Sequence, residues 1–227
     1  FNPGQFFRET ALAPYSLGLE SFVPSYQFDL ATGRANPLDF VANVTLTREG
    51  ESLDKQIRVN EPLGVDGTTV YLLGNGFAPW VTVTSASGDV VFSQPVAFLP
   101  QDSNLTSLGI VKLPDGLSEQ LGLVGFFYPS AVALESGAFT SVSPEPDQPL
   151  LTFNVFSGDL GLDEGVPRNV YSLDTEELTQ LTGGDTGETS LVMGLGQTAD
   201  LPNGMGTVEF TSLPRFVSVD IHRDPTQ

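Results

Sequence analysis

The chain has 227 residues, with 9 Lys and Arg against 28 Asp and Glu, and a formal net charge of −19. So few basic residues cannot neutralise many phosphates, which argues against nucleic acids and anionic lipid surfaces as partners. There is no cysteine, which excludes disulfides, thiolate nucleophiles and Cys-ligated metal centres. The negative charge favours solubility and would attract a basic partner.

The ends of the chain and its apolar runs bear on its context. No run of about 18 apolar residues occurs, so no segment is expected to cross a membrane. The first residue is Phe1 rather than Met, and we expect the chain to be a piece of a longer protein. Residues 1–20 show no clear period and are expected to be loosely attached.

Several short segments alternate apolar and polar residues, which is the pattern of a half-buried β-strand. In chain order they are residues 40–47, 80–84, 152–156, 207–211 and 216–222. In the last of them, Val217, Val219 and Ile221 share one face. A hairpin is expected where residues 81–84 and 90–92 flank a turn at 87–89.

One segment predicts a helix. Asp174 or Thr175 can cap a short helix over residues 174–181, because acidic residues follow in its first turn. Residues 182–190 are rich in Gly and acidic residues and predict a mobile loop.

The distribution of turn residues predicts the fold class. The 24 Gly and 17 Pro are spread evenly, which suits many short strands and suits long helices poorly. We therefore expect an all-β protein, an antiparallel β-sandwich or stacked sheets, with the one short helix near 174–181. A single domain over residues 1–227 is the simplest organisation, and a division near the Pro-rich bend at 143–148 is the alternative.

The residues that usually carry chemistry are scarce. His222 is the one histidine, so a site with two or more histidine ligands is excluded, and a hydrolase triad would have to use this residue. By alternation it shares a polar strand face with Ser218 and Asp220, as an exposed strand-end histidine does. The loop at 158–165 offers hard oxygen ligands but lacks the alternating Asp pattern of a calcium loop, so calcium binding stays open.

Aromatic residues offer a candidate contact surface. Phe126, Phe127 and Tyr128 are consecutive, so strand alternation should place at least one of them away from the core. We therefore expect a partner surface at these three residues. Trp80, the one tryptophan, is the residue to test for a carbohydrate-binding strip.

Nine segments in order resemble the large extracytoplasmic loop of ResB-type cytochrome c biogenesis proteins, particularly the actinobacterial kind. The similarity runs across nearly the whole chain, from about Phe6 to Pro225. The segments are VNEPL (59–63), VYLLGNGFAP (70–79), VAFLPQD (96–102), GIVKLPD (109–115), GFFYPSA (125–131), SGDLGLDEGVP (157–167), VYSLD (170–174), LPNGMGTVEF (201–210) and HRDP (222–225).

The resemblance implies a place at the outer face of the cytoplasmic membrane, as a loop between the helices of a multi-pass protein. ResB-type proteins work with ResC-type partners to deliver haem and attach it to apocytochrome c, with a thioredoxin-like reductant as a further partner. The resemblance implies that haem is handled by the full complex, and that this domain binds no cofactor itself; His222 is the weak candidate for a haem contact. Some ResB proteins carry a loop cysteine implicated in haem contact, and this sequence has none.

Three functional classes follow. The first is a docking or chaperone domain of a haem-ligation complex, with no catalytic activity of its own. The second is a secreted β-sandwich that binds carbohydrate or mediates adhesion. The third is a hydrolase that depends on His222.

Overall fold

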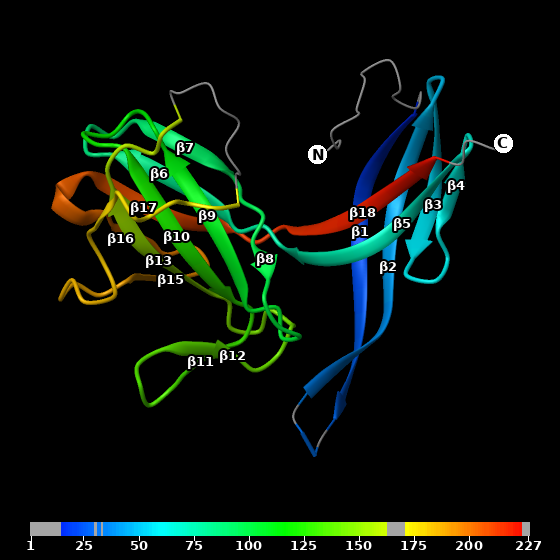
Figure 1. Ribbon diagram of the computed structural model, residues 1–227. Coiled ribbons are helices and arrows are strands. Elements are labelled where there is room, and N and C mark those ends of the chain that lie inside the picture. Colours follow the sequence, from blue (N-terminus) through cyan, green and yellow to red (C-terminus); the bar gives the residue numbers. More distant parts are fainter. Residues whose placement is uncertain (1–14, 30, 33, 163–170, 224–227) are drawn as a thin grey trace. The chain divides into compact units, whose positions relative to one another are not determined.

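The structure is a computed structural model and describes residues 15–29, 31–32, 34–162 and 171–223 (Figure 1). Strands account for 61% of it and helix for 2%, which confirms the all-β prediction. Among the described residues, the one helical element is the 3-10 turn η2 (Pro202–Gly204). Among the described residues there is no helix with the length and hydropathy that crossing a bilayer requires.

The strands, in chain order, are β1 (Tyr15–Asp29), β2 (Arg34–Arg48), β3 (Glu51–Arg58), β4 (Leu63–Val65), β5 (Thr68–Phe77), β6 (Trp80–Ser85), β7 (Val90–Pro95), β8 (Leu99–Pro100), β9 (Ser107–Leu113), β10 (Leu121–Tyr128), β11 (Ala131–Ala133), β12 (Phe139–Ser141), β13 (Leu150–Ser157), β14 (Thr179–Gln180), β15 (Leu191–Gly194), β16 (Thr198–Asp200), β17 (Gly206–Ser212) and β18 (Arg215–Arg223).

The chain divides into two compact units. Unit 1 consists of residues 1–27, 37–75 and 217–227, and unit 2 consists of residues 28–36 and 76–216. Strands β5 and β18 each contribute residues to both units. Residues 143–148, where the sequence suggested a division, lie inside unit 2.

Unit 1 contains two three-stranded sheets, β1-β2-β3 and β18-β5-β4. Its core is built by alternate residues of their strands: Ala42, Val44, Ile57, Val70 and Leu72. The strand expected at residues 40–47 is confirmed. Its apolar positions face this core because one face of β2 is covered and the other is solvated.

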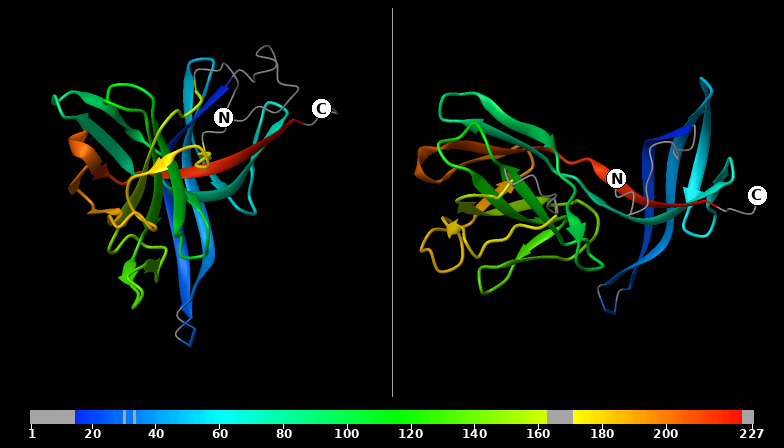
Figure 2. Two further views of the ribbon diagram at one scale, coloured as in Figure 1. Left: turned by 60° about the vertical axis from the view of Figure 1, so that its left-hand side comes forward. Right: turned by 45° about the horizontal axis from the view of Figure 1, so that its top comes forward.

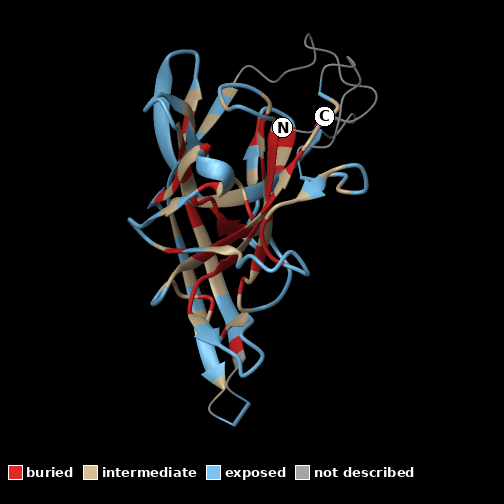
Figure 3. Cartoon of the chain, turned by 90° about the vertical axis from the view of Figure 1, so that its left-hand side faces the viewer, coloured by how far each residue is buried: buried red, intermediate tan, exposed pale blue. Residues whose placement is uncertain are grey.

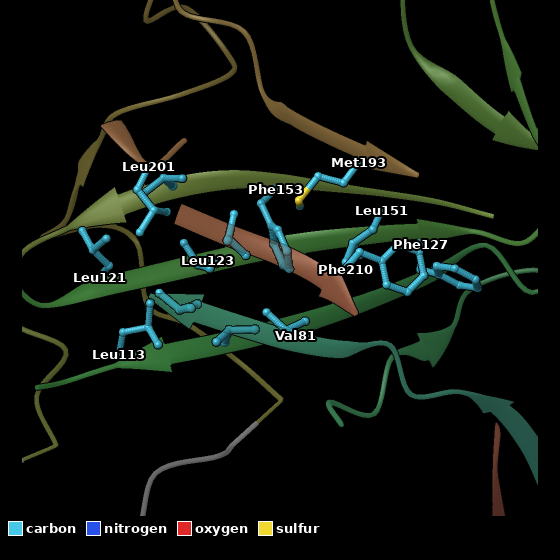
Figure 4. Packing of buried hydrophobic residues seen from close by; sticks show 14 of the residues in the cluster. Val81, Leu113, Leu121, Leu123, Phe127, Leu151, Phe153, Met193, Leu201 and Phe210 are labelled. Atoms are coloured by element: carbon cyan, nitrogen blue, oxygen red, sulfur yellow. The ribbon is translucent and has the colours of Figure 1, made fainter. Parts of the chain in front are cut away.

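Unit 2 is an antiparallel β-sandwich. Its larger sheet has the order β14-β13-β10-β9-β8, with β15 also pairing with β13, and its smaller sheet has the order β16-β17-β6-β7. Side chains from both sheets meet in a large apolar core (Figure 4), which confirms the predicted architecture. Figure 3 shows that the buried residues lie along strands and that exposed residues occupy the turns and parts of other strands.

The other predicted strands of unit 2 are also confirmed. The inward-facing apolar residues of the segments 80–84, 152–156 and 207–211 are fully buried: Val81, Val83, Phe153, Val155, Val208 and Phe210. The hairpin around residues 87–89 is present as β6 and β7. Gly88 has a φ of 90° in its turn, a conformation that glycine adopts without strain.

The prediction of a helix at residues 174–181 is wrong. The Asp174 carboxylate accepts a bond from the Glu176 amide (3.2 Å), and the Leu178 amide donates to the Thr175 carbonyl (3.2 Å), so one turn forms where the helix was expected to start. The next residues form β14 and pair with β13. Tertiary strand pairing therefore overrides a weak local helix signal.

Two predicted loop segments have different outcomes. Residues 15–20 begin β1, and the Tyr15 hydroxyl bonds the Thr68 hydroxyl at 2.8 Å, so these residues of the segment lie in a sheet. Residues 1–14 lie outside the described residues. Residues 182–190 form no strand or helix, as expected, but Thr182 and Ser190 tie the segment to β13 through hydrogen bonds of 2.9 Å and 2.6 Å.

Candidate functional site

His222 lies near the end of β18, in unit 1, and its side chain is 65% exposed. Its Nε2 atom is 2.6 Å from the Asp220 carboxylate, so the two side chains share a strand face as alternation predicted. The ring also contacts Tyr71 edge-on, with centroids 5.6 Å apart. This is the environment of an exposed strand histidine held by a neighbouring carboxylate.

Metal ligation has no support in the described part of the chain. No group of three or more His, Asp or Glu side chains there could hold a metal ion. In the loop at 158–165, the Asp159 carboxylate accepts a bond from the Gly161 amide (2.7 Å) and so closes its own turn. Residues 163–165 of this loop lie outside the described residues.

The three aromatic residues at 126–128 differ in burial. Phe127 is fully buried between Phe77 and Phe210, with ring centroids 5.1 Å and 6.1 Å away. Tyr128 is 9% exposed, and Phe126 is partly buried on the opposite face of β10. Alternation therefore places Phe126 away from the core as predicted, and a partner surface at these three residues stays a prediction.

The Tyr128 phenol has a shifted pKa. Burial raises the pKa above its usual value because the phenolate loses its hydration, and a hydrogen bond with Thr152 offsets this in part. The ring packs against Phe139, with centroids 5.9 Å apart. Tyr128 therefore acts as a neutral packing residue beneath β12.

Strands β11 and β12 form a separate two-stranded hairpin, which lies apart from both sheets of unit 2 (Figures 1 and 2). Three of its large apolar side chains are exposed: Val132 at 43%, Leu134 at 47% and Val142 at 51%. The sequence reasoning missed this hairpin because each strand has three residues. The turn at Ser136-Gly137 was the available signal.

A buried polar network holds the base of the hairpin. The Ser141 hydroxyl accepts a bond from the Ser130 amide (3.0 Å) and donates to the Ser143 carbonyl (2.9 Å). The Ser130 hydroxyl donates to the Glu145 carbonyl (2.6 Å), and the Asn104 amide group donates to the Ser141 carbonyl (2.9 Å). Because Ser130 and Ser141 are buried, these bonds fix the hairpin where it leaves the sandwich.

Most of the negative charge lies in unit 2, which is also the longer unit. Residues 28–36 and 76–216 contain 18 Asp and Glu against 4 Lys and Arg, a net of −14, whereas the rest of the chain has a net of −5. One of the four basic residues, Arg215, packs against an aromatic ring and forms an ion pair. Its guanidinium lies 4.2 Å from the centroid of the Phe77 ring and 3.6 Å from the Glu145 carboxylate. Unit 2 therefore presents a strongly anionic surface.

Unit 1 has a shallow hollow of about 690 Å³ on the polar face of β1-β2-β3. Its lining includes Glu20, Asn43, Thr45, Asp54 and Gln56. Several of these bond one another: Thr45 donates to Glu20 (2.8 Å), and Gln56 donates to Asn43 (2.9 Å). The bonds span the three strands and stabilise the sheet.

The fold defines an acidic, all-β protein of two compact units. A family model described as the ResB-like family matches residues 1–227, so the chain belongs to this family. Membership indicates a role in cytochrome c biogenesis, and the family is typically membrane-associated. No curated protein and no solved structure matches the chain. The resemblance found in the sequence is thereby confirmed at the level of the family.

Proposed function

We propose that the chain is the extracytoplasmic domain of a ResB-type protein and that it docks polypeptide partners for haem ligation. The partners are a ResC-type membrane protein and apocytochrome c, with a thioredoxin-like reductant acting in the same pathway. The domain holds a partner in place, and the full complex handles haem. Family membership supports the pathway.

The observation that carries the docking role is the charge of unit 2, a net of −14. A surface of one sign raises the local concentration of oppositely charged segments and speeds their encounter. A basic, unfolded polypeptide is the kind of partner that such a field attracts. Salt screens this attraction, because the Debye length falls to about 8 Å at physiological ionic strength.

The composition of the chain supports a binding role, in which this domain does not itself catalyse covalent haem attachment. The thiols that bond to haem belong to the CxxCH motif of apocytochrome c, and this chain adds no cysteine and one histidine. His222 is already held by Asp220 on an exposed strand. We therefore assign binding to this domain, and assign the reactive groups to the membrane segments and the partner.

The proposed location is the outer face of the cytoplasmic membrane, between two membrane helices of the same protein. The reading frame that encodes the chain tests this directly. The proposal requires an apolar run of at least about 18 residues on each side of this segment. A frame without such runs would contradict the location.

The secreted carbohydrate-binding alternative rests on Trp80. Its indole Nε1 donates to the Ser93 hydroxyl (3.0 Å), and Thr82 bonds both Ser93 (3.0 Å) and Thr211 (2.9 Å). The indole nitrogen is thus bonded within a small hydroxyl network of the sheet, whereas a sugar-binding strip uses several flat aromatic faces. The docking role is therefore the better supported function.

Co-purification tests the docking role in the assembled system. The full-length protein, expressed with its ResC-type partner, should retain reduced apocytochrome c when the domain is present. A version in which residues 76–216 carry neutral replacements at exposed acidic positions should retain less. Equal retention by both versions would contradict the proposal.

A further inference from the structure

The two faces of the β11–β12 hairpin are chemically different. Residues opposite each other in an antiparallel pair lie on the same face. Ala131 pairs with Ser141, and Ala133 pairs with Phe139. These pairs form the inner face, on which Phe139 contacts Tyr128 and Ser141 is buried.

The outer face of the hairpin carries the exposed aliphatic residues. Val132 pairs with Thr140, the Leu134 amide bonds the Ala138 carbonyl (2.8 Å), and the Val142 amide bonds the Ser130 carbonyl (3.1 Å). Val132, Leu134 and Val142 therefore share one face, and all three are exposed. Solvated strand faces normally carry polar residues, so this arrangement reverses the usual pattern.

The hairpin is held rigidly enough to present this face. The base is fixed by the buried bonds of Ser130 and Ser141, and the Tyr128 ring packs against Phe139. The turn closes with a bond from the Gly137 amide to the Leu134 carbonyl (2.9 Å). A preformed surface loses little conformational entropy when a partner binds.

Acidic residues flank the aliphatic face at both ends. Glu135 is exposed in the turn, next to Leu134. Asp147 is exposed near the base, next to Gln148, whose carbonyl accepts a bond from the Ala131 amide (3.1 Å). A partner segment with aliphatic side chains in the middle and basic side chains at the ends would match this pattern.

Two other occupants fit less well. A second copy of the chain would bring together two units that each have a net charge of −14, and three aliphatic side chains fall far short of the roughly 800 Å² that each partner of a stable dimer buries. An anionic lipid surface would be repelled by the same charge. Charge complementarity therefore favours a basic polypeptide.

We infer that the outer face of the β11–β12 hairpin, formed by Val132, Leu134 and Val142, docks an extended basic segment of a polypeptide partner through its aliphatic side chains. This inference rests on the proposed docking function and locates the contact surface within unit 2. The aliphatic contacts provide selectivity among basic segments, while the charge of the unit provides attraction.

Peptide titration followed by NMR of the whole 227-residue chain tests the inference. The probe is the acetylated and amidated peptide Lys-Leu-Ser-Val-Ser-Leu-Lys, and the matched peptide replaces its Leu and Val with Ser. The probe should bind about tenfold more tightly than the matched peptide and should shift the amide signals of residues 130–142. Equal affinity for the two peptides would overturn the hairpin's role while leaving the electrostatic docking function intact.

The chain offers a matched pair of variants. V132S/L134S removes two side chains of the hairpin, and V192S/L195S removes two at β15 and just after it, with nearly the same exposure (44% and 49%). The first should weaken probe binding about tenfold, and the second should leave it within about twofold. Equal losses in both variants would overturn the inference, as would no loss in either.

The competing occupants are tested with the same proteins. Sedimentation with vesicles of zwitterionic phosphatidylcholine, and the oligomeric state by light scattering, should be the same for the wild type and V132S/L134S. Vesicle binding or self-association that the wild type shows and V132S/L134S lacks would overturn the inference in favour of a lipid surface or a second copy.

Discussion

The Tyr128 ring packs against the Phe139 ring with centroids 5.9 Å apart and an interplanar angle of 51°. Tyr128 ends the central strand β10 of the larger sheet, and Phe139 begins β12 of the projecting hairpin. The contact therefore links the rigid part of unit 2 to the surface that we propose for docking. Changes at either residue should affect the hairpin and the stability of unit 2 together.

Replacing Tyr128 with Phe should change how stability depends on pH. Burial raises the folded-state pKa of this phenol, whereas the unfolded chain titrates at about 10. The stabilisation from the neutral phenol is thus complete below about pH 10 and is lost as the pH rises through the folded-state pKa. Urea unfolding at about pH 8 and pH 10.5 should show a smaller loss of stability in Y128F than in the wild type.

The exposed Tyr171 provides the control for this measurement, since its relative exposure is 50%. Y171F should lose stability between the two pH values as the wild type does. An identical pH response in Y128F, Y171F and the wild type would show that Tyr128 does not carry this dependence.

Replacing Ser141 with Ala should destabilise unit 2 by about 1–3 kcal/mol, because the buried Ser130 amide loses its acceptor. Trp80 lies in unit 2, so its fluorescence during urea unfolding reports the change. S118A, at an exposed serine, should change stability by less than about 0.5 kcal/mol. Similar values for the two variants would contradict the role given to the buried network.

Two arginines test how burial determines the strength of an ion pair. Arg215 is 18% exposed and stacks on Phe77, while Arg48 is 50% exposed and lies 2.6 Å from Asp66. R215L should lower the free energy of unfolding by about 1–3 kcal/mol, because the cation–π contact and the packing of the side chain are lost. R48L should lower the free energy of unfolding by less than about 1 kcal/mol, although the ion pair of Arg48 is shorter than that of Arg215. Urea unfolding followed by circular dichroism gives both values, and an equal or larger cost for R48L would contradict this ranking.

A glycine in the core tests the packing of the sandwich. A Cβ atom at Gly125 would lie 2.5 Å from the Phe153 ring and 2.8 Å from the Phe98 ring, whereas a Cβ at Gly74 would meet nothing within 4 Å. G125A should therefore destabilise the chain by about 1–3 kcal/mol through overpacking. G74A should be neutral or slightly stabilising. Thermal unfolding of both variants checks this, and a neutral G125A would contradict the packing of β10 against these rings.

Much of the fold was predictable from the sequence, because alternation is a strong signal wherever one face of a strand is buried. It located β2, β6, β13 and β17, and it chose their inward residues correctly. It was less reliable for β18: the strand is present, but Val219 and Ile221 are 37% and 47% exposed, while Val217 packs on the core of unit 1. The period gives the face of a strand, and only the tertiary structure shows how far along that face the core extends.

The candidate surface was harder to predict. Alternation placed Phe126 away from the core, but it could not show that Tyr128 is covered by Phe139 of the next hairpin. The short hairpin β11–β12 gives too few residues for a period to emerge. The predicted helix at residues 174–181 does not form because β14 pairs with β13. This is a long-range contact, which local propensity cannot predict.

The salt dependence of partner binding tests the central claim most directly. The 227-residue chain is titrated with reduced, haem-free apocytochrome c at NaCl concentrations from about 20 mM to about 500 mM, and NMR identifies the residues that respond. We expect binding at low salt that weakens at least about tenfold over this range, with the responding amides in residues 76–216. Binding that does not change with salt, or no binding at about 20 mM NaCl, would contradict the account.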